Sequence, residues 1–281
     1  MTTLTLNQVR TLIESKKSVR WEAGETSVSH VSRTSKPGMA YFGIGASEEQ
    51  LAETAGPTFE MTAVAKAPAL PKALDWRNKS GANYVTSVKN QLDCGSCVAF
   101  ATCASLEARD SVGRQSPNPG LDLAEAHLFF CGCGLCCGSG WQPAAAMAFA
   151  QSTGVGLEVD FPYLPHNQPC KSGITSHLKI RSHTTANPMT ARKRAIGDGP
   201  VVAAMKVFRD FPYYKGGIYT PVSKDLLGLH AVCVIGYDTP GKYWIIKNSW
   251  GPGWGSGGFG RIAFGTSCEI DKQFPFWIPI L

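Results

Sequence analysis

The sequence predicts an α+β fold in which helices dominate the first half of the main body and a sheet or barrel dominates the second. Two patterns support this prediction. Apolar residues recur at helical spacing between residues 97 and 151, and short β-rich runs separated by Gly and Pro follow Pro200. The composition, 43% hydrophobic and 17% charged, is ordinary for a chain that packs a hydrophobic core.

The start of the chain differs in composition from the rest. Residues 1–22 place apolar side chains at roughly helical spacing, whereas residues 23–72 are rich in Gly, Ser, Thr, Ala and Pro. We therefore expect a leader with one helix and a linker, followed by a main domain over residues 73–281.

Three segments of the main domain carry helix patterns. Residues 97–111 are mostly apolar, which predicts a buried helix. A second helix is expected over residues 123–130. A third is expected over residues 143–151, which begin with Pro at the first helical position and are followed by Gly154.

Five runs in the second half are rich in β-branched and aromatic residues, which favours strands. They are VVAAM from Val201, GGIYT from Gly216, HAVCVIGY from His230, KYWIIKNSW from Lys242 and GFGRIAF from Gly258. Gly and Pro separate the runs, so we expect them to assemble into a sheet or a barrel.

The charge and hydropathy patterns exclude two classes of partner. The net charge of +6 is spread along the chain, with no basic run longer than Arg192 to Arg194, so we expect no nucleic-acid binding. No apolar run approaches the roughly 20 residues of a membrane span. Residues 1–20 also lack the apolar core of a secretory signal.

The ten cysteines indicate disulfides, because six of them gather in two short segments. Disulfides persist in oxidising compartments, which suggests an extracytoplasmic or secreted destination although no signal peptide is visible. The localisation therefore stays open.

The segment QLDCGSCVAF, residues 91–100, contains the first candidate for chemistry. Cys97 lies where a loop gives way to a helix, and unpaired backbone N–H groups there favour a thiolate. Cys94 and Cys97 could instead form a thioredoxin-like redox pair. That motif belongs at the start of a βαβ unit, and no parallel-strand pattern precedes it here.

A thiol nucleophile needs a base, and His230 lies in an apolar strand pattern that suits this role. Asn248 ends the next strand pattern and could accept a hydrogen bond from the imidazole, which would fix its tautomer. The other histidines are more often solvated or capping residues in such contexts; they are His30, His127, His166, His177 and His183.

From about Ala73 to the C-terminus, the chain resembles the papain-like cysteine proteases. Four strings in the family order carry the resemblance: Leu74-Asp-Trp-Arg77, Val88-Lys-Asn-Gln-Leu-Asp-Cys-Gly-Ser-Cys97, His230-Ala-Val232, and Lys247-Asn-Ser-Trp250 with Gly253-Trp-Gly255. The leader lacks the usual long helical signature. Its run Trp21-Glu-Ala-Gly-Glu-Thr26 is similar to leaders of some bacterial members, which implies a bacterial-type protein with a short prosegment.

The resemblance implies a papain-like two-lobed fold with the active-site cleft between the lobes. The helical lobe would span about 85–180 and the antiparallel, barrel-like β lobe about 181–275. Cys97 would be the nucleophile and His230 the general acid and base, and the two would form an ion pair across the cleft. The remaining roles would be imidazole orientation by Asn248, oxyanion stabilisation by Gln91, and shielding by Trp250.

The resemblance also implies disulfides that pair Cys94 with Cys137 and Cys131 with Cys170. A third pair, Cys133 with Cys136, would close a small extra loop. A zinc site in the run CGCGLCC is the alternative, but zinc sites usually draw two spaced pairs of ligands, so we expect no metal and no cofactor. Cys103 and Cys233 suit small buried positions, and Cys268 lacks its usual partner.

Substrate contacts are also implied by the resemblance. An extended peptide would lie along Gly138, Ser139 and Gly140 like an added strand. The pocket for the second residue before the cut would involve Trp141, Gln142, Ala204, Gly228 and Gln273, with a preference for an apolar or aromatic side chain.

The expected function is that of a monomeric cysteine endopeptidase made as a latent zymogen, with peptide substrates and the leader as an inhibitor removed near Lys72 or Ala73. Three residues depart from the family pattern: Leu92 replaces Gly, Val98 replaces Trp, and Leu229 replaces Asp. They motivate the alternative of a catalytically silent peptide-binding relative. A transpeptidase that uses the same site is a further alternative.

Overall fold

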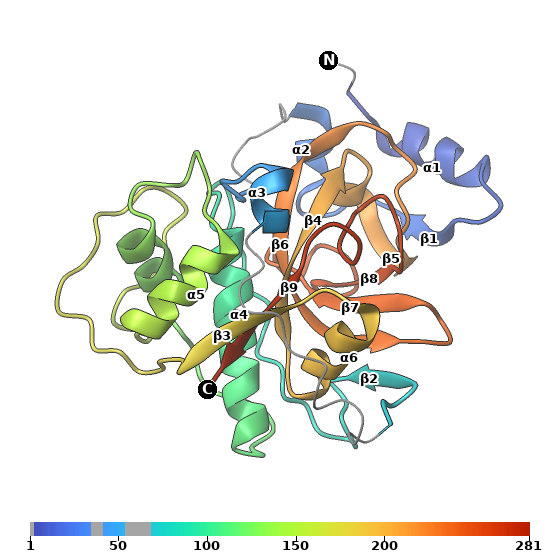
Figure 1. The fold of residues 1–281 in the computed structure, drawn as a ribbon. Helices are drawn as coiled ribbons and strands as arrows, with labels where there is room; N and C mark the ends of the chain where they lie inside the picture. Colours follow the sequence, from blue (N-terminus) through green and yellow to red (C-terminus); the bar gives the residue numbers. More distant parts are fainter. Residues whose placement is uncertain (1–2, 35–41, 54–68) are drawn as a thin grey trace.

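A computed structural model describes residues 3–34, 42–53 and 69–281 of the chain (Figure 1). Helices α4 and α5 lie on one side of the molecule, and the large sheet lies on the other. The predicted order of a helical half before a sheet half is therefore confirmed.

The helical half is built around α4, residues Cys97–Gly113, which is buried along nearly its whole length. Most of its side chains are small or apolar, as expected for a helix surrounded by protein, and the buried exceptions Glu107 and Arg109 have hydrogen-bond partners. Helix α5, Pro143–Ser152, begins with the predicted Pro. The predicted helix over residues 123–130 is displaced toward the C-terminus and becomes a short π-helix, η2, over His127–Cys131.

The β half contains a seven-stranded antiparallel sheet. Its path runs β3-β9-β4-β6-β7-β8, and β2 pairs with β6. The strands are β2 (Ala73–Asp75), β3 (Ser182–Ala186), β4 (Val201–Phe208), β6 (Leu226–Asp238), β7 (Tyr243–Lys247), β8 (Phe259–Ala263) and β9 (Phe276–Ile280).

Strand β6 occupies the centre of the sheet and contacts α4 directly. It pairs with β4 and β7, and eight consecutive residues from His230 onward are buried. A continuous apolar run is what a strand covered on both faces requires. This placement brings the start of α4 and the middle of β6 together.

The leader has more structure than the sequence predicts. Helix α1, Leu6–Glu14, starts with a capping box formed by Thr5 and Gln8. The helix ends at Glu14 and does not continue to residue 22, because the chain turns there into strand β1, Arg20–Ala23. The expected linker contains helices α2, Ser29–Thr34, and α3, Glu48–Glu53.

Strand β1 attaches the leader to the main domain by antiparallel pairing with β5, Tyr214–Ile218. Trp21 anchors the pair, because its indole N–H donates to Thr220 O at 2.9 Å and its rings pack against Tyr219 at 5.2 Å. Gly217 has φ +87°, and a Cβ there would lie 2.3 Å from Arg20 O. Only glycine therefore allows the two strands to approach this closely.

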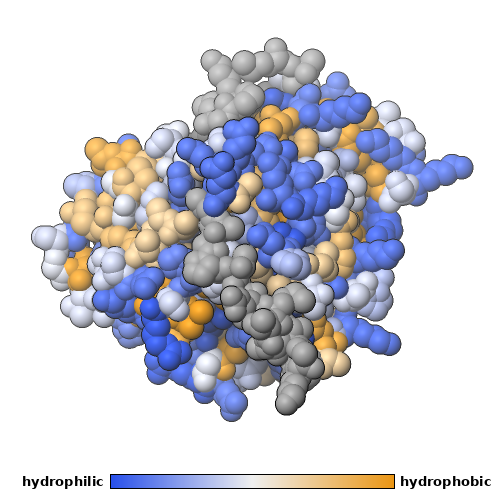
Figure 2. All heavy atoms as spheres, in the orientation of Figure 1, coloured by the Kyte–Doolittle hydropathy of each residue, from blue (hydrophilic) through white to orange (hydrophobic). Residues whose placement is uncertain are grey.

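The apolar core forms two clusters, one in each half, and the leader contributes to both. Val9, Trp21 and Val28 join the cluster of the β half, whereas Ile44 and Leu51 join the cluster of the helical half. In Figure 2, hydrophilic residues predominate on the part of this face that carries the leader helices and the β half. Within the described residues, no helix is long and apolar enough to cross a membrane.

A buried network of charged residues joins the two halves. Lys247, at the end of β7, donates to Thr86 at 2.7 Å, and Thr86 donates to Glu107 of α4 at 2.5 Å. Glu107 also accepts the N–H of Leu123 at 2.9 Å. Lys89 lies 2.8 Å from Glu125 and 3.6 Å from Glu107. Each carboxylate in this network is therefore held by cations and hydrogen bonds.

Replacing Glu107 by Ala should strongly destabilise the fold, because it leaves two buried lysines without part of their counter-charge. We expect the free energy of unfolding to fall by roughly 3 to 5 kcal/mol, as measured by urea denaturation. Asp110→Ala is the matched control: it removes a pair with Arg114, whose side chain is 70% exposed, on the same helix. The control should cost less than about 1 kcal/mol. Equal losses in both variants would contradict the importance of the network.

Candidate active site

Cys97 is the first residue of α4 and is fully buried. The backbone N–H of Ala231 points at its sulfur from β6, with N and Sγ 3.4 Å apart. The N–H groups of Gly43 and of the first residues of α4 also donate toward the sulfur. Several backbone dipoles therefore converge on this thiol, which is the electrostatic arrangement that stabilises a thiolate.

His230 lies in β6 immediately before Ala231, so the register of that strand sets its distance from Cys97. Its Nε2 lies 2.8 Å from Asn248 Oδ1, and its Nδ1 has no hydrogen-bond partner among the described residues. The Trp250 indole covers the imidazole, with the ring centroids 4.8 Å apart. This geometry fixes the ring orientation and excludes water from the hydrogen bond to Asn248.

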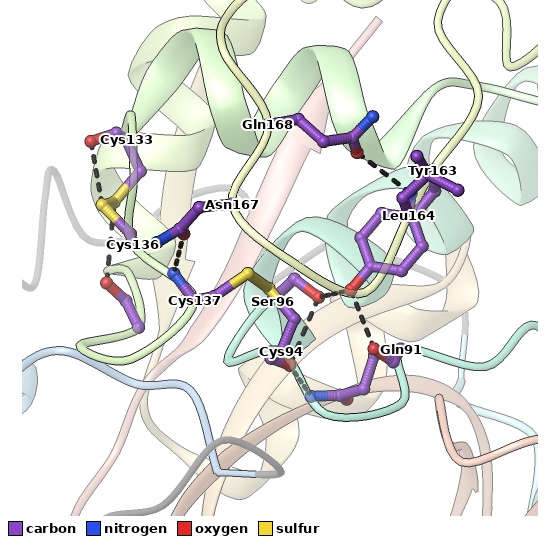
Figure 3. The surroundings of a disulfide bond; sticks show 11 residues. Gln91, Cys94, Ser96, Cys133, Cys136, Cys137, Tyr163, Leu164, Asn167 and Gln168 are labelled. Carbon is purple, nitrogen blue, oxygen red and sulfur yellow. Dashed lines mark hydrogen bonds between the residues drawn. A yellow bond between two sulfur atoms is a disulfide. The ribbon is translucent and has the colours of Figure 1, made fainter.

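Gln91 is fully buried beside the nucleophile loop, and its amide is held from both ends. The Ser249 hydroxyl donates to Oε1 at 2.6 Å, while Nε2 donates to Cys94 O at 3.0 Å. Figure 3 shows the Gln91 side-chain amide next to Cys94, while the Tyr163 hydroxyl donates to the backbone carbonyl of Gln91 at 2.8 Å. The second N–H of the amide remains available for a developing oxyanion.

The leader passes through the cleft between the two halves at Gly43 and Ile44. Trp141 N donates to Gly43 O at 2.8 Å, and Gly45 N donates to Trp141 O at 3.0 Å. A Cβ on Gly43 would lie only 1.9 Å from Gly95 O. The leader therefore needs glycine here to lie against the nucleophile loop. The side chain of Phe42 packs against the Trp250 indole, with centroids 6.0 Å apart.

Burial under the leader keeps both predicted catalytic groups neutral. It raises the pKa of the Cys97 thiol to about 11, and the N–H groups of Ala231 and Gly43 counter only part of this shift. Burial also lowers the pKa of His230 to about 4, although the hydrogen bond from its Nε2 to Asn248 Oδ1 opposes the shift. Both shifts disfavour the expected thiolate and imidazolium pair in this covered state, because burial removes the solvation that stabilises the two charges.

The predicted substrate residues divide into two groups. Gly140, Trp141 and Gln142 contact the leader, with Gln142 Nε2 3.5 Å from Gly45 O. The other predicted substrate residues have less direct contacts with the leader. Ser139 O lies close to Gly45, Gly228 lies against Phe42, and Ala204 is buried in the same cluster as Ile44; Gly138 is exposed. Gln273 donates its backbone N–H to Glu269 O, and its place in the pocket stays a prediction.

The structure contains three disulfides: Cys94–Cys137, Cys131–Cys170 and Cys133–Cys136. They are the pairs that the family resemblance implies, and they use every cysteine of the run CGCGLCC. Cys103, Cys233 and Cys268 are buried free thiols. In the part of the chain that the structure describes, no cluster of His, Cys, Asp or Glu could hold a metal ion.

Leu92 shows the structural meaning of one departure from the family pattern. Its φ is +49°, in the left-handed region that favours glycine, and its side chain is largely exposed. Its backbone N–H donates to Asn90 Oδ1 at 3.1 Å. A bulky residue therefore replaces glycine here without entering the site, at the cost of local backbone strain.

Ser249 and Tyr163 are residues near the site that sequence patterns did not identify. Ser249 holds the Gln91 amide, and Tyr163 joins Gln91 O to the Ser96 hydroxyl, with its own hydroxyl 2.7 Å from Ser96 Oγ. The position of Ser249 directly after Asn248 is a signal in the sequence from which its place near the site could have been predicted. Tyr163 lies 72 residues from Gln91, so no local pattern could connect them.

Comparison with known sequences decides the family. A sequence model described as papain family cysteine protease matches residues 70–277. This chain belongs to the papain family of cysteine proteases.

Relatives of the papain-family chain include plant and animal enzymes. It is 36% identical to ananain of Ananas comosus over 207 residues, which are 72% of this chain and 58% of ananain. It is 33% identical to cathepsin L2 of Homo sapiens over 211 residues, 69% of this chain and 61% of that protein. This papain-family chain thus spans about three fifths of these curated relatives.

A solved structure described as recombinant stem bromelain precursor shares the fold with a TM-score of 0.77 and 28% identity. The alignment covers 98% of this papain-family chain and 88% of the precursor, so it includes the leader. Matching relatives come from plants, protozoa, animals and a virus, which supports the papain family as a whole and not a bacterial branch of it.

Gln91→Ala should remove one donor to the oxyanion and lower kcat by roughly 100- to 1000-fold, with little change in KM. Ser249→Ala should also lower kcat, but by a smaller factor. The Gln91 amide is still present in this variant and loses only the hydrogen bond that orients it. Steady-state hydrolysis of a fluorogenic peptide by leader-free enzyme measures both effects. Gln142→Ala is the control at the cleft border. A fall in kcat as large as that of Gln91→Ala in this control would contradict the assignment.

The covered state should lose stability in acid through His230. The folded pKa of about 4 lies below the unfolded value of about 6.5, so the unfolded chain binds the extra proton. The contribution of His230 to the free energy of unfolding is complete above pH 6.5 and is lost as the pH falls toward 4. Between pH 7 and pH 4, full-length Cys97→Ser protein should lose up to about 3 kcal/mol more unfolding free energy than Cys97→Ser/His230→Gln protein. Parallel pH profiles of urea denaturation would refute this.

Proposed function

We propose that this chain is a cysteine endopeptidase that cleaves peptide bonds through an acyl-thioenzyme and is made as a latent zymogen. The observation that carries the proposal is the convergence of Cys97, His230, Asn248 and Gln91 under a leader segment that fills the cleft. Family membership supports the chemistry, and the match to a bromelain precursor supports latency.

The proposed reaction begins once the leader leaves the cleft and water reaches the site. His230 then takes the proton from Cys97, and the start of α4 and the imidazolium stabilise the thiolate. The sulfur attacks the carbonyl carbon of the substrate. The negative oxygen that forms accepts hydrogen bonds from Gln91 Nε2 and the Cys97 N–H.

The second half of the proposed reaction releases both products. The imidazolium of His230 gives its proton to the leaving amine as the peptide C–N bond breaks and leaves a thioester on Cys97. His230 then takes a proton from water, whose oxygen attacks the thioester and frees the acid. Throughout both steps Asn248 keeps the imidazole in one orientation.

The proposed zymogen divides at the end of the leader, residues 1–72, from the peptidase domain, residues 73–281. A cut near Lys72 or Ala73 fits the fold, because β2 starts at Ala73 and pairs with β6. The Lys72 carbonyl also accepts the N–H of Thr239 at 2.8 Å. Cutting here would preserve β2 and release the segment that covers Cys97.

The proposed substrates carry an apolar or aromatic residue two positions before the cut. Burial of Ile44 beside Trp141 and Ala204 supports an apolar pocket at this part of the cleft. We further propose that the enzyme acts as a monomer without a cofactor. The more specific assignment to a bacterial-type member with a short prosegment depends on the leader sequence from Trp21 to Thr26 alone.

A catalytically silent peptide-binding protein is the main alternative, and a transpeptidase is the second. The complete set of Cys97, His230, Asn248 and Gln91 argues against the silent protein. Transpeptidation differs only in whether water or an amine attacks the thioester, and product analysis by mass spectrometry separates the two.

The proposed function is tested with an epoxysuccinyl reagent, which alkylates activated thiols, followed by peptide mapping. We expect a stoichiometric adduct on Cys97 in protein cut at residues 72/73 after folding, and little adduct in the intact chain. Gly43→Ala should label the intact chain faster, because its Cβ cannot fit against Gly95.

Gly113→Ala is the matched glycine control, since a Cβ there meets nothing within 4 Å. It should label as slowly as the unchanged protein. Equal labelling of intact and cut chains would refute latency. No adduct on Cys97 in any folded form would refute the protease and favour the silent peptide-binding alternative.

A further inference from the structure

The disulfide Cys133–Cys136 differs in kind from the other two. It spans 3 positions in the sequence, whereas Cys94–Cys137 and Cys131–Cys170 span 43 and 39. A cross-link within one turn ties no distant segments together, so it removes little entropy from the unfolded chain. Cys133–Cys136 therefore contributes least to holding the fold, and stability alone gives little reason for it.

The small ring closed by Cys133 and Cys136 is accessible to a reagent in solution. Both cysteines are half-buried, and Leu135 between them is 68% exposed. Cys94 and Cys137, by contrast, are buried. Cys131 is half-buried and Cys170 is exposed, so the size of the ring, and not its access to solvent, distinguishes Cys133–Cys136 from that pair. Accessible Cys-x-x-Cys disulfides in short rings are the type that exchanges readily with thiols.

The ring supports the segment from Ser139 to Trp141, against which the leader lies in the cleft. The Cys136 carbonyl accepts the N–H of Gly140 at 2.8 Å and that of Ser139 at 3.2 Å. The sulfur of Cys133 lies 3.6 Å from Gly140 O. The next residue, Trp141, makes the backbone hydrogen bonds to the leader. A change in the ring can therefore reach the segment from Ser139 to Trp141, which binds the leader, through its backbone.

The ring also adjoins the nucleophile loop. Cys136 is followed by Cys137, whose disulfide to Cys94 lies beside Gln91 in Figure 3. Cys137 O accepts the N–H of Gly95 at 2.8 Å. The ring thus lies one residue from a buried cross-link that fixes the loop before Cys97.

We propose that Cys133–Cys136 is a reversible redox site that changes the affinity of the cleft for peptides. The thiolate form of a small thiol such as glutathione attacks one sulfur of the ring. The S–S bond of the ring breaks, and a mixed disulfide between the small thiol and the protein forms. A second thiol attacks the glutathione sulfur of that mixed disulfide, releases the protein thiolate and leaves as the oxidised dimer. Two electrons pass to the pair, which gains two protons. The open ring loosens the carbonyl of Cys136 and with it the segment at Gly140, whose N–H donates to that carbonyl.

The redox step is tested on full-length Cys97→Ser protein, which cannot process itself. Samples are equilibrated at graded ratios of reduced to oxidised glutathione, and free thiols are trapped by isotope-coded alkylation and mapped. We expect Cys133 and Cys136 to be reduced, and reoxidised on reversal, at ratios that leave the other two disulfides intact. Reduction of all three pairs together, or only after the other two, overturns the proposal.

The effect on peptide binding rests on the proposed peptidase function. Processed Cys133→Ser/Cys136→Ser enzyme should show KM raised by roughly fivefold or more with little change in kcat, at a glutathione ratio that keeps the unchanged ring closed. Leu135→Ser, which keeps the disulfide, should retain the original KM. An unchanged KM in the double variant overturns the coupling. If no variant hydrolyses peptides, the proposed function fails, and the alkylation result still decides the redox site.

Discussion

The contact between α4 and β6 is the constraint on which the rest of the structure depends. The helix carries Cys97 in its first turn and the strand carries His230 near its centre, so the packing of the two elements sets the distance between the proposed nucleophile and base. Small side chains on both elements, among them Ala101 and Ala231, line the space between them and allow close approach. The strand pairs with β2, β4 and β7, which leaves it little freedom to slide. Fixing a reactive pair on regular elements and not on loops gives the precision that catalysis requires.

The charged network behind the site serves the same geometry. Lys247 immediately precedes Asn248, so the residue that holds Glu107 through Thr86 also limits where the amide of Asn248 can lie. Burial raises the pKa of Glu125, and the ammonium of Lys89 counters part of that shift. Lys89 itself stays charged, because its carboxylate neighbours outweigh the cost of burial. Removing one residue of the network would leave an unpaired charge inside the protein. The network must therefore be complete, even if as a whole it adds little to the free energy of unfolding.

Much of this arrangement follows from the sequence, and the exceptions have physical reasons. The helix at Cys97 and the strand at His230 have strong local patterns, and short motifs identify Asn248 and Gln91. Strand β3 reads SHTTA and β9 contains Pro279, so neither resembles a strand until pairing with a neighbour supplies the hydrogen bonds. The path of the leader through the cleft depends on contacts between residues nearly 100 positions apart, such as Gly43 with Trp141. Periodicity reports local preference and cannot report such pairing.

In the proposed zymogen, strand β5 exists in two situations, covered by β1 while the leader is present and uncovered after its removal. Uncovered strand edges invite pairing with other chains, and natural proteins blunt them with short length and lysine, while glycine inside a strand weakens it. Strand β5 has all three: it runs only over Tyr214–Ile218 and reads YKGGI, with Lys215 exposed. The same glycines that admit the leader therefore make a poor template for foreign strands. The resistance of the leader-free protein to aggregation therefore depends in part on the sequence of strand β5.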